Sequence, residues 1–426
     1  MRAAFYECDI TPPLGGDMPG YYGPNPACDV FERLYAKAAV IEDGGHYAAI
    51  LTIDTCEVDP SFHEAITRRV EAYTGIPPKD VCLHVTHTHK GAPTEDIPSI
   101  GQHADATYKD VMVRLAADAV TLAYKRLGTA EGYFALGRVE GLAFNRNYLL
   151  ANGSAVSFSA GGRPTVGMLS TPDDDLPLLL FKRGDEPIGA IFSFACHQDS
   201  TGDEVNGYSS DFSGVVAKEL KKQYGPDFVT LFLLGAAGDV NHVDPARETP
   251  YPPFWHREMG KRLANALLRV ADEAVPVGGG VSTVKEEITL GLRRADEDYV
   301  KRQSAAWANA YAGGMRTRNL LRYAADGQKT EDALLLQVIR IGEVGIYAFA
   351  GEVYADFGRA VKARASLPHA IVATNCNSHG GYIPTPAAFD PAYDLYETSL
   401  CEGSRHTPEA GERMVDKLLA MEKKLS

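Results

Sequence analysis

Three histidines stand close together in the stretch HVTHTHKGAP, residues 84 to 93, at the end of an apolar run. The chain has only 12 histidines, so this spacing concentrates groups that bind metals or move protons. Residues i and i+2 of a strand project to the same side, which predicts that His87 and His89 face one side together. Two such imidazoles either share a metal ion or divide the work of ligand and base. His84 is out of phase with them, and we predict a hydrogen-bonded core histidine there.

A His-x-His pair is by itself compatible with several kinds of site. It opens metallo-β-lactamase sites, but those continue with Asp-His, whereas His89 is followed by Lys-Gly-Ala-Pro. It also opens amidohydrolase barrels, which need eight strand–helix units that we cannot count in this chain. An exposed polar turn is the plainest alternative. These interpretations all stay open at this point.

A further histidine follows the apolar stretch PIGAIFSFACH, residues 187 to 197, which we predict to be a strand. Cys196 and His197 are neighbours, so on a strand they would point to opposite faces, which disfavours a cysteine nucleophile activated by this histidine. We therefore interpret His197 as a third imidazole of a metal site, with a structural histidine as the alternative. The sequence has no GxSxG elbow and no P-loop, which removes the commonest serine-hydrolase and nucleotide-hydrolase interpretations.

The stretch LLGAAGDVNHVDP is rich in small residues that let backbone N–H groups approach a substrate oxygen. Gly235, Gly238 and Asn241 are therefore candidates for substrate binding, and a plain tight turn is the alternative. Asp239 is a candidate to orient a ligand histidine from behind. Asp211 is a candidate for the same supporting role or for the cap of the helix that begins there.

Apolar patterns predict alternating strands and helices. The predicted strands cover residues 36–42, 47–53, 81–87, 187–197, 228–234, 344–352 and 370–377, and the predicted helices cover 60–73, 104–126, 210–225, 254–272, about 295–324 and a segment from 353. Asp59 is the expected N-cap of the first helix, and Gly75 ends it. Because ligands bind outside the carboxyl ends of strands in α/β sheets, residues as distant as 87 and 352 are expected to meet if these strands share a sheet edge.

We therefore expect one α/β catalytic unit over residues 1–426, with mixed sheets flanked by helices, a metal site at the C-terminal ends of strands and a helical insertion at about 295–325. The net charge of −14 excludes a nucleic-acid partner. No apolar run is long enough to span a membrane, and the first residues lack the apolar core of a signal peptide, so we expect a cytoplasmic protein. The seven cysteines are scattered and indicate reduced thiols. The sequence leaves the oligomeric state unknown.

Taken in order, these residues resemble the neutral/alkaline non-lysosomal ceramidase family, in its N-terminal catalytic domain. The matching motifs are DITPP followed by MPGYYG, THTHKGAP, FNRN, a Cys-His pair followed by SSDFSG, GAAGDV, FAGE, and GGYIPT followed by YE. They run from residue 9 to about residue 403. The family's usual GDVSP motif has Asn241 in place of its serine here. The chain also leaves no room for the immunoglobulin-like C-terminal domain that ceramidases add.

The resemblance implies one zinc ion per chain, bound by His87, His197, Glu352 and Tyr382. It implies proton transfer by His89, and binding or polarisation of the scissile carbonyl by Arg146 and Tyr396. From the residues alone, Glu352 fits the first turn of a helix, Arg146 a surface cation and Tyr382 a packing residue.

The expected function is a zinc-dependent hydrolase that cleaves the amide C–N bond of an N-acyl or related small substrate with a metal-activated water. The same site would also serve a cyclic amide, a lactam or an ester. A catalytically inactive homologue that binds a metal or ligand is a further alternative, and Asn241 is its main support. Because the chain ends where it does, a sphingolipid substrate is less expected than the amide chemistry itself.

Overall fold

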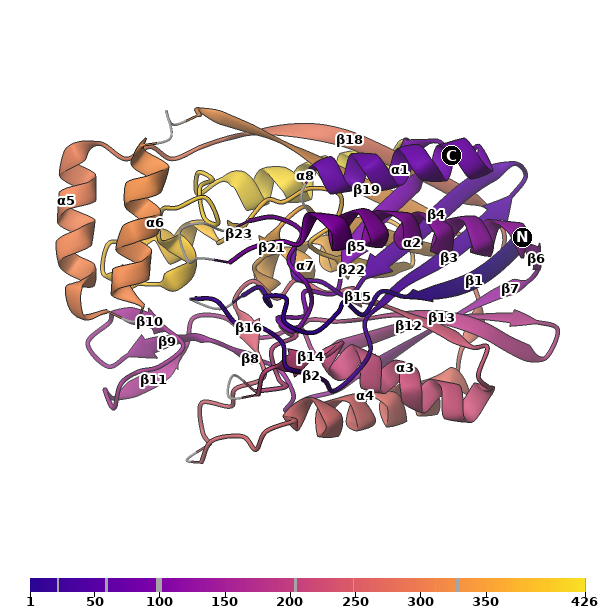
Figure 1. Ribbon diagram of the computed structural model, residues 1–426, viewed down its shortest axis with the longest axis horizontal. Helices are drawn as coiled ribbons and strands as arrows, with labels where there is room; N and C mark the ends of the chain where they lie inside the picture. Colours follow the sequence, from indigo (N-terminus) through magenta and orange to yellow (C-terminus); the bar gives the residue numbers. More distant parts are fainter. Residues whose placement is uncertain are drawn as a thin grey trace.

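The computed structural model describes residues 1–20, 23–57, 60–96, 102–202, 205–247, 249–310, 312–325 and 329–425 (Figure 1). Three main sheets carry the fold, and each has a pair of helices on its outer face. The inner faces of all three sheets contribute to one apolar core, which includes Ile50, Leu231 and Ile346. Within the described residues, no helix is long and apolar enough to cross a membrane.

The first sheet has the strand order β5-β4-β3-β1-β6. Its strands are β1 (Arg2–Asp9), β3 (Tyr35–Asp43), β4 (His46–Ile53), β5 (Val81–Val85) and β6 (Gly128–Thr129). The helices α1 (Pro60–Thr74) and α2 (Ala106–Lys125) bury Phe62 and Met112 in a core against this sheet. Asp105 caps α2 by accepting N–H bonds from its first turn, and Gly75 (φ 75°) follows α1.

The second sheet has the strand order β15-β13-β12-β7-β17. Its strands are β7 (Glu131–Arg138), β12 (Asp175–Arg183), β13 (Glu186–Phe194), β15 (Val229–Leu234) and β17 (Val275–Pro276). The helices α3 (Asp211–Tyr224) and α4 (Trp255–Ala271) cover it. Gly260 of α4 lets the two helices approach closely, because a Cβ there would lie 2.5 Å from the Cβ of Val215.

The third sheet has the strand order β18-β19-β20-β22. Its strands are β18 (Val281–Gly291), β19 (Glu331–Ile341), β20 (Val344–Ala348) and β22 (His369–Ala373). The helices α7 (Ala355–Arg364) and α8 (Ala410–Glu422) pack on it through Val361 and Met414. The helices α5 (Glu297–Ala306) and α6 (Gly313–Ala325) form a hairpin between β18 and β19, at one end of the molecule in Figure 1.

The same ββαβ unit occurs once in each sheet. Each unit is an antiparallel hairpin whose second strand also pairs in parallel with the strand that follows the next helix: β3-β4-α1-β5, β12-β13-α3-β15 and β19-β20-α7-β22. A strand–helix–strand crossover of this kind aligns the carboxyl ends of its two strands. Loops from all three units can therefore meet on one side of the molecule.

Buried hydrogen bonds join the three units where these strands end. The Thr52 hydroxyl donates to the Phe232 carbonyl (3.1 Å), the Leu234 N–H donates to His84 Nε2 (2.9 Å), and the Thr374 N–H donates to the Leu234 carbonyl (2.8 Å). The strands before the site therefore do not meet at one sheet edge, which was the condition under which residues 87 and 352 were expected to come together. They belong to three sheets whose strand ends converge.

The predicted strands and helices are present as strands and helices, but four of the predicted strands end earlier than expected. The strands expected to reach residues 87, 197, 352 and 377 end at Val85, Phe194, Ala348 and Ala373. His87 follows β5 with φ 64° and Asn375 follows β22 with φ 51°, so the backbone leaves the strand direction at both places. The expected cap Asp59 lies outside the described residues, and Ser210 before α3 makes no side-chain capping bond.

Candidate metal centre and its cavity

His87, His197 and Glu352 come together from the three ββαβ units. Glu352 Oε2 lies 3.2 Å from His87 Nε2 and 3.0 Å from His197 Nε2, and the two imidazole rings are 4.7 Å apart. All three side chains are buried. The sequence suggested that His87 and His89 face one side because they alternate along a strand. Both residues instead follow the end of β5. The left-handed backbone at His87 turns its ring instead.

Hydrogen bonds fix which nitrogen of each imidazole can bind a metal. His87 Nδ1 lies 2.8 Å from the Cys56 carbonyl oxygen, and His197 Nδ1 lies 2.8 Å from that of Ala237. A carbonyl oxygen only accepts, so each Nδ1 carries the hydrogen and each Nε2 presents its lone pair to Glu352. Two neutral imidazoles and a carboxylate are a donor set that zinc prefers.

The close approach of these atoms requires a positive charge between them. Without one, two nitrogen lone pairs would face a carboxylate oxygen, and His87 Nε2 is buried without a hydrogen bond among the described residues. In the metal-free protein a proton meets this need: burial alone would lower the pKa of His87, but Cys56 and Glu352 raise it well above its usual value. A divalent cation would take the place of that proton. The residues therefore fit a metal ion.

Glycines allow the backbone that carries Glu352 to approach its neighbours. Glu352 begins the short strand β21 (Glu352–Val353), which pairs in parallel with β23 (Tyr382–Ile383), opposite Tyr382. Gly351 has φ 86°, and a Cβ on it would lie 2.5 Å from the Gly381 carbonyl oxygen. A Cβ on Gly238 would lie 2.4 Å from the Glu352 carbonyl oxygen. The motifs FAGE, GGY and GAAG are therefore packed directly on one another.

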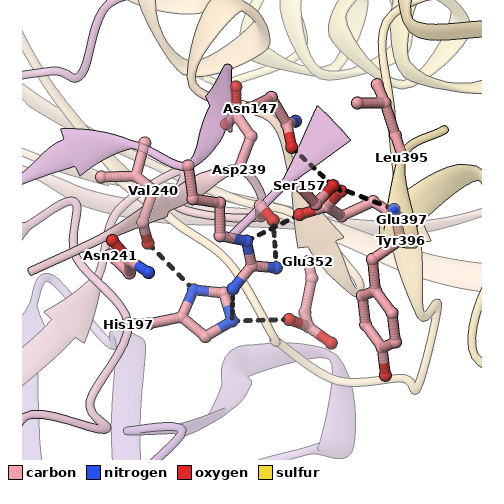
Figure 2. Close-up of polar contacts among 12 residues, drawn as sticks. Asn147, Ser157, His197, Asp239, Val240, Asn241, Glu352, Leu395, Tyr396 and Glu397 are labelled. Carbon is pink, nitrogen blue, oxygen red and sulfur yellow. Dashed lines mark hydrogen bonds and ion pairs between the residues drawn. The ribbon is translucent and has the colours of Figure 1, made fainter. Parts of the chain in front are cut away.

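Arg146 is buried, and its side chain contacts both His197 and Glu397, which Figure 2 shows near Glu352. Its Nε donates to Glu397 Oε1 (2.6 Å), its Nη2 donates to the Gly238 carbonyl oxygen (2.8 Å), and its Nη1 lies 3.3 Å from His197 Nε2. Its guanidinium carbon is 5.5 Å from the centre of the Tyr382 ring. Arg146 is thus a fixed cation next to the metal-binding atoms, and not a surface residue.

His89, Tyr382 and Tyr396 line the same cavity as His87 and Glu352. The cavity has a volume of about 340 Å³. The His89 ring is 5.1 Å from the His87 ring, and the rings of Tyr382 and Tyr396 are 5.8 Å apart. Burial, followed by the neighbouring His87, lowers the pKa of His89 to about 3, so its imidazole is neutral. The structure therefore brings together all seven residues for which the resemblance implied ligand or catalytic roles.

The sequence profile described as "Neutral/alkaline non-lysosomal ceramidase, N-terminal" matches residues 6–244, more than half of the 426 residues. The chain belongs to this family. Membership indicates a hydrolase that acts on amide bonds.

Solved ceramidases have the same fold. The neutral ceramidase from Pseudomonas aeruginosa is 18% identical, with a TM-score of 0.74, and the similarity covers 100% of this chain and 75% of that chain. A ceramidase complexed with C2 is 17% identical, with a TM-score of 0.75 over 99% of this chain and 74% of that one. A comparison with curated protein sequences found no match.

The glycines of the GAAGDV motif have a different role from the expected binding of a substrate oxygen. The Gly235 N–H donates to the Phe194 carbonyl and the Gly238 N–H donates to the Val353 carbonyl, so both donors are used within the protein. Asn241 is buried, and its Oδ1 accepts the Val243 N–H. These residues shape the backbone around Arg146 and Glu352.

The two supporting aspartates also act differently from the expectation, because in the described part of the chain neither forms a hydrogen bond or ion pair with His87 or His197. Asp239 accepts hydrogen bonds from the Asn145 amide (2.6 Å) and from the Ala355 N–H at the start of α7 (2.8 Å). Asp211 accepts from the Ser200 hydroxyl and the Thr201 N–H, and so holds the loop that follows His197. Backbone carbonyls orient the two histidines in place of these carboxylates.

Sequence reasoning missed Glu397, although it follows Tyr396 in the quoted YE motif. Glu397 is completely buried, and besides Arg146 it accepts a hydrogen bond from the Ser157 hydroxyl (2.7 Å). The same hydroxyl oxygen accepts the Tyr396 N–H (2.9 Å). A buried acid needs a charged partner, and Arg146 of the FNRN motif is that partner. Pairing the FNRN motif with the YE motif would therefore have identified Glu397 from the sequence.

Two other residues of the sequence analysis have the structural roles expected of them. His84 is fully buried, with Nδ1 2.8 Å from the Thr52 hydroxyl and Nε2 accepting the Leu234 N–H, which confirms a hydrogen-bonded core histidine. Cys196 packs in the core under α3 and α4. Burial raises the pKa of the Cys196 thiol well above its usual value, so this thiol is not an activated nucleophile.

A second group with metal-binding side chains lies at the edge of the same cavity. His379 lies between two carboxylates, with Nε2 3.5 Å from Glu57 and Nδ1 3.7 Å from Glu95. Burial alone would lower the pKa of His379, but Glu57 and Glu95 raise it to about 9. Both nitrogens of His379 thus face acids, and the ion pairs join the segments that carry these three residues.

Proposed function

We propose that this member of the ceramidase family is a zinc-dependent amidase with one zinc ion per chain and a compact substrate. The proposal rests mainly on one observation. His87 Nε2 and His197 Nε2 both lie within 3.2 Å of Glu352 Oε2, although the three residues come from three separate units of the fold. Tyr382 lines the same cavity and is proposed as the fourth ligand. Amide hydrolysis is the chemistry that membership of the family indicates.

The proposed roles of the other residues follow from where they lie. A zinc ion held by these ligands would polarise the amide carbonyl and lower the pKa of a bound water to about 7. His89 lies on the cavity wall beside His87, so it is proposed to accept the proton of the water and return it to the leaving amine. Arg146 and Tyr396 would stabilise the charge that develops on the carbonyl oxygen, and losing one such donor costs roughly 10² to 10³ in rate.

The size of the cavity supports a compact substrate. Its volume of about 340 Å³ is near the lower end of the roughly 300–1,000 Å³ found for small-molecule sites. Its lining includes several charged and hydroxyl-bearing side chains, among them Glu57, Arg322 and Ser404. A short polar N-acyl compound fits this description better than a lipid with two long chains.

The proposal is tested by replacing one ligand and measuring metal and activity together. His197→Ala removes one of the two imidazoles, so we expect zinc content to fall from about one per chain towards zero and amide hydrolysis to be lost. The matched control is His46→Ala, which removes an exposed histidine of β4 and is expected to keep both. Retention of stoichiometric zinc by His197→Ala would refute the ligand assignment. Zinc without hydrolysis of any N-acyl compound by the unchanged protein would refute the amidase.

A further inference from the structure

The wall of the cavity formed by α6 is independent of the metal-binding residues. Met315, Arg316, Asn319, Arg322 and Tyr323 all line the cavity from this one helix. In Figure 1 the α5–α6 hairpin stands beside the C-terminal segment that carries β23, and hence Tyr382. The α6 residues therefore line the same cavity as His87 and Glu352.

Arg316 is held rigidly in this wall. Its side chain is only 4% exposed. Its Nε donates to the Ser399 hydroxyl (2.8 Å) and its Nη2 to Asp394 Oδ1 (2.7 Å), while its guanidinium carbon lies 4.5 Å from the centre of the Trp307 ring. An arginine fixed in this way loses little side-chain entropy when it binds a further group.

The remaining terminal nitrogen of Arg316 has no such partner. Within the described part of the chain, the hydrogen bonds of Arg316 use Nε and Nη2, and none uses Nη1. One turn further along α6, Asn319 Oδ1 is also buried without a hydrogen bond. Rotating the Asn319 amide by 180° would place Nδ2 there as a second donor. The rotation loses little, because the present partner of Nδ2 is the sulfur of Met315, which is a weak acceptor. The wall thus offers two adjacent polar groups to the cavity.

We propose that Arg316 and Asn319 form a subsite for a carboxylate of the substrate, so that the amides hydrolysed are N-acylated amino acids or compounds of the same form. This inference rests on the proposed amidase function. The planar guanidinium is the side chain best suited to a carboxylate, and charge-assisted bonds of this kind are the strong ones. The acids Glu57 and Glu95 on the cavity edge are engaged with the cation of His379, which limits their repulsion of such a substrate.

The test compares a carboxylate with its neutral counterpart. Binding of N-acetylleucine and of N-acetylleucinamide to the zinc-loaded protein would be measured by calorimetry. A hydrogen bond to a charged group implies that the carboxylate binds about 10- to 100-fold more tightly than the amide. In Arg316→Gln we expect this preference to fall to about threefold or less, and in Asn319→Leu to fall by a smaller factor. The control Arg318→Gln removes an exposed charge from the same helix and should keep the full preference.

The comparison of two ligands separates recognition from a purely structural role. If Arg316 only supports the segment around Ser399, Arg316→Gln weakens both ligands by the same factor and the preference remains, which overturns the subsite. Equal affinities in the unchanged protein, or no binding of either ligand, overturn it as well. Acetate release, measured on the same pair, tests the amidase separately. A binding preference without acetate release contradicts the amidase but supports the subsite. Equal acetate release from both compounds supports the amidase but contradicts the subsite.

Discussion

Arg146 shows how far a site residue depends on neighbours that do no chemistry. Its guanidinium contacts a carboxylate, a backbone carbonyl and a proposed zinc ligand at once, and the carboxylate of Glu397 is the buried acid that balances its charge. From the sequence alone Arg146 was expected at the surface, because nothing in FNRN shows that an acid 251 residues later lies beside it. Single residues of this kind are predictable only when both partners are recognised together.

We predict that Glu397→Gln lowers kcat by about 10- to 100-fold and leaves the zinc content unchanged. The amide can still accept from Nε of Arg146, but it carries no charge, so Arg146 is held less firmly where it would meet the carbonyl oxygen. The buried arginine also loses its counterion, which is expected to cost about 3–5 kcal/mol of stability. Steady-state kinetics, metal analysis and thermal unfolding check these outcomes, with the exposed Glu71→Gln as the matched control. An unchanged kcat in Glu397→Gln would contradict the positioning role.

The elements were predicted well where a local pattern carries the information. Helices such as α1 and α3 have periodic apolar residues and end at glycines with positive φ, and both were found within a few residues. The strands β1, β7, β12, β18 and β19 were not predicted. β18 shows the reason. Its residues 282–287 are all partly or fully exposed and include three charged side chains, so they lack an alternating apolar pattern, and the strand is fixed by its pairing with β19. The ends of β5 and β22 were overestimated because His87 and Asn375, which follow them, turn the backbone at positive φ.

The contact between β21 and β23 gives a prediction about glycine at the scale of elements. Gly351→Ala adds a Cβ that meets the Gly381 carbonyl at 2.5 Å and also forces a left-handed backbone on alanine, so it should push Glu352 away from the two histidines. We expect a loss of roughly 3 kcal/mol or more in unfolding free energy, together with weaker zinc binding.

Gly153→Ala is the matched control for this prediction. Gly153 also has a positive φ, 83°, but a Cβ there meets nothing within 4 Å. Gly153→Ala should lower the free energy of unfolding by only about 1–2 kcal/mol and leave the zinc affinity unchanged. Denaturant unfolding and zinc titration of both variants measure the difference, and equal losses in the two would show that the close approach at Gly351 does not matter.

For the whole molecule, the central feature is that three similar ββαβ units each contribute one group to the metal centre. His87 follows the last strand of the first unit, His197 the second strand of the second unit, and Glu352 the second strand of the third. The sequence indicated the polar strand ends and offered a shared sheet edge as one way in which they could meet. Periodicity shows roughly where strands end, but not which sheet they join. Since the three sheets also share a core, we infer that residues 1–426 act as a single catalytic unit.

His84 links the first and second units, and its burial predicts how stability depends on pH. Burial, with the nearby His87, lowers the pKa of His84 to about 3 from its ordinary 6.5. The unfolded chain therefore binds a proton that the native protein excludes, so stability is complete above pH 6.5 and falls as the pH drops from 6.5 towards 3. The slope from this residue is at most about 1.4 kcal/mol per pH unit.

The variant His84→Gln isolates that contribution. Glutamine can still accept the Leu234 N–H, but it does not titrate, so the slope of unfolding free energy against pH should become shallower by up to that amount between pH 6.5 and 5. Chemical denaturation at a series of pH values measures it. Parallel lines for the variant and the unchanged protein would contradict the account of His84.

The position of the metal ion tests the central claim most directly. A crystal structure of the zinc-loaded protein, with anomalous scattering recorded at the zinc edge, would locate the ion without reference to activity. We expect one peak, about 2.0–2.2 Å from Nε2 of His87, Nε2 of His197 and a carboxylate oxygen of Glu352. A peak between Glu57, Glu95 and His379 instead, or no peak beside His87 and His197 at saturating zinc, would contradict it.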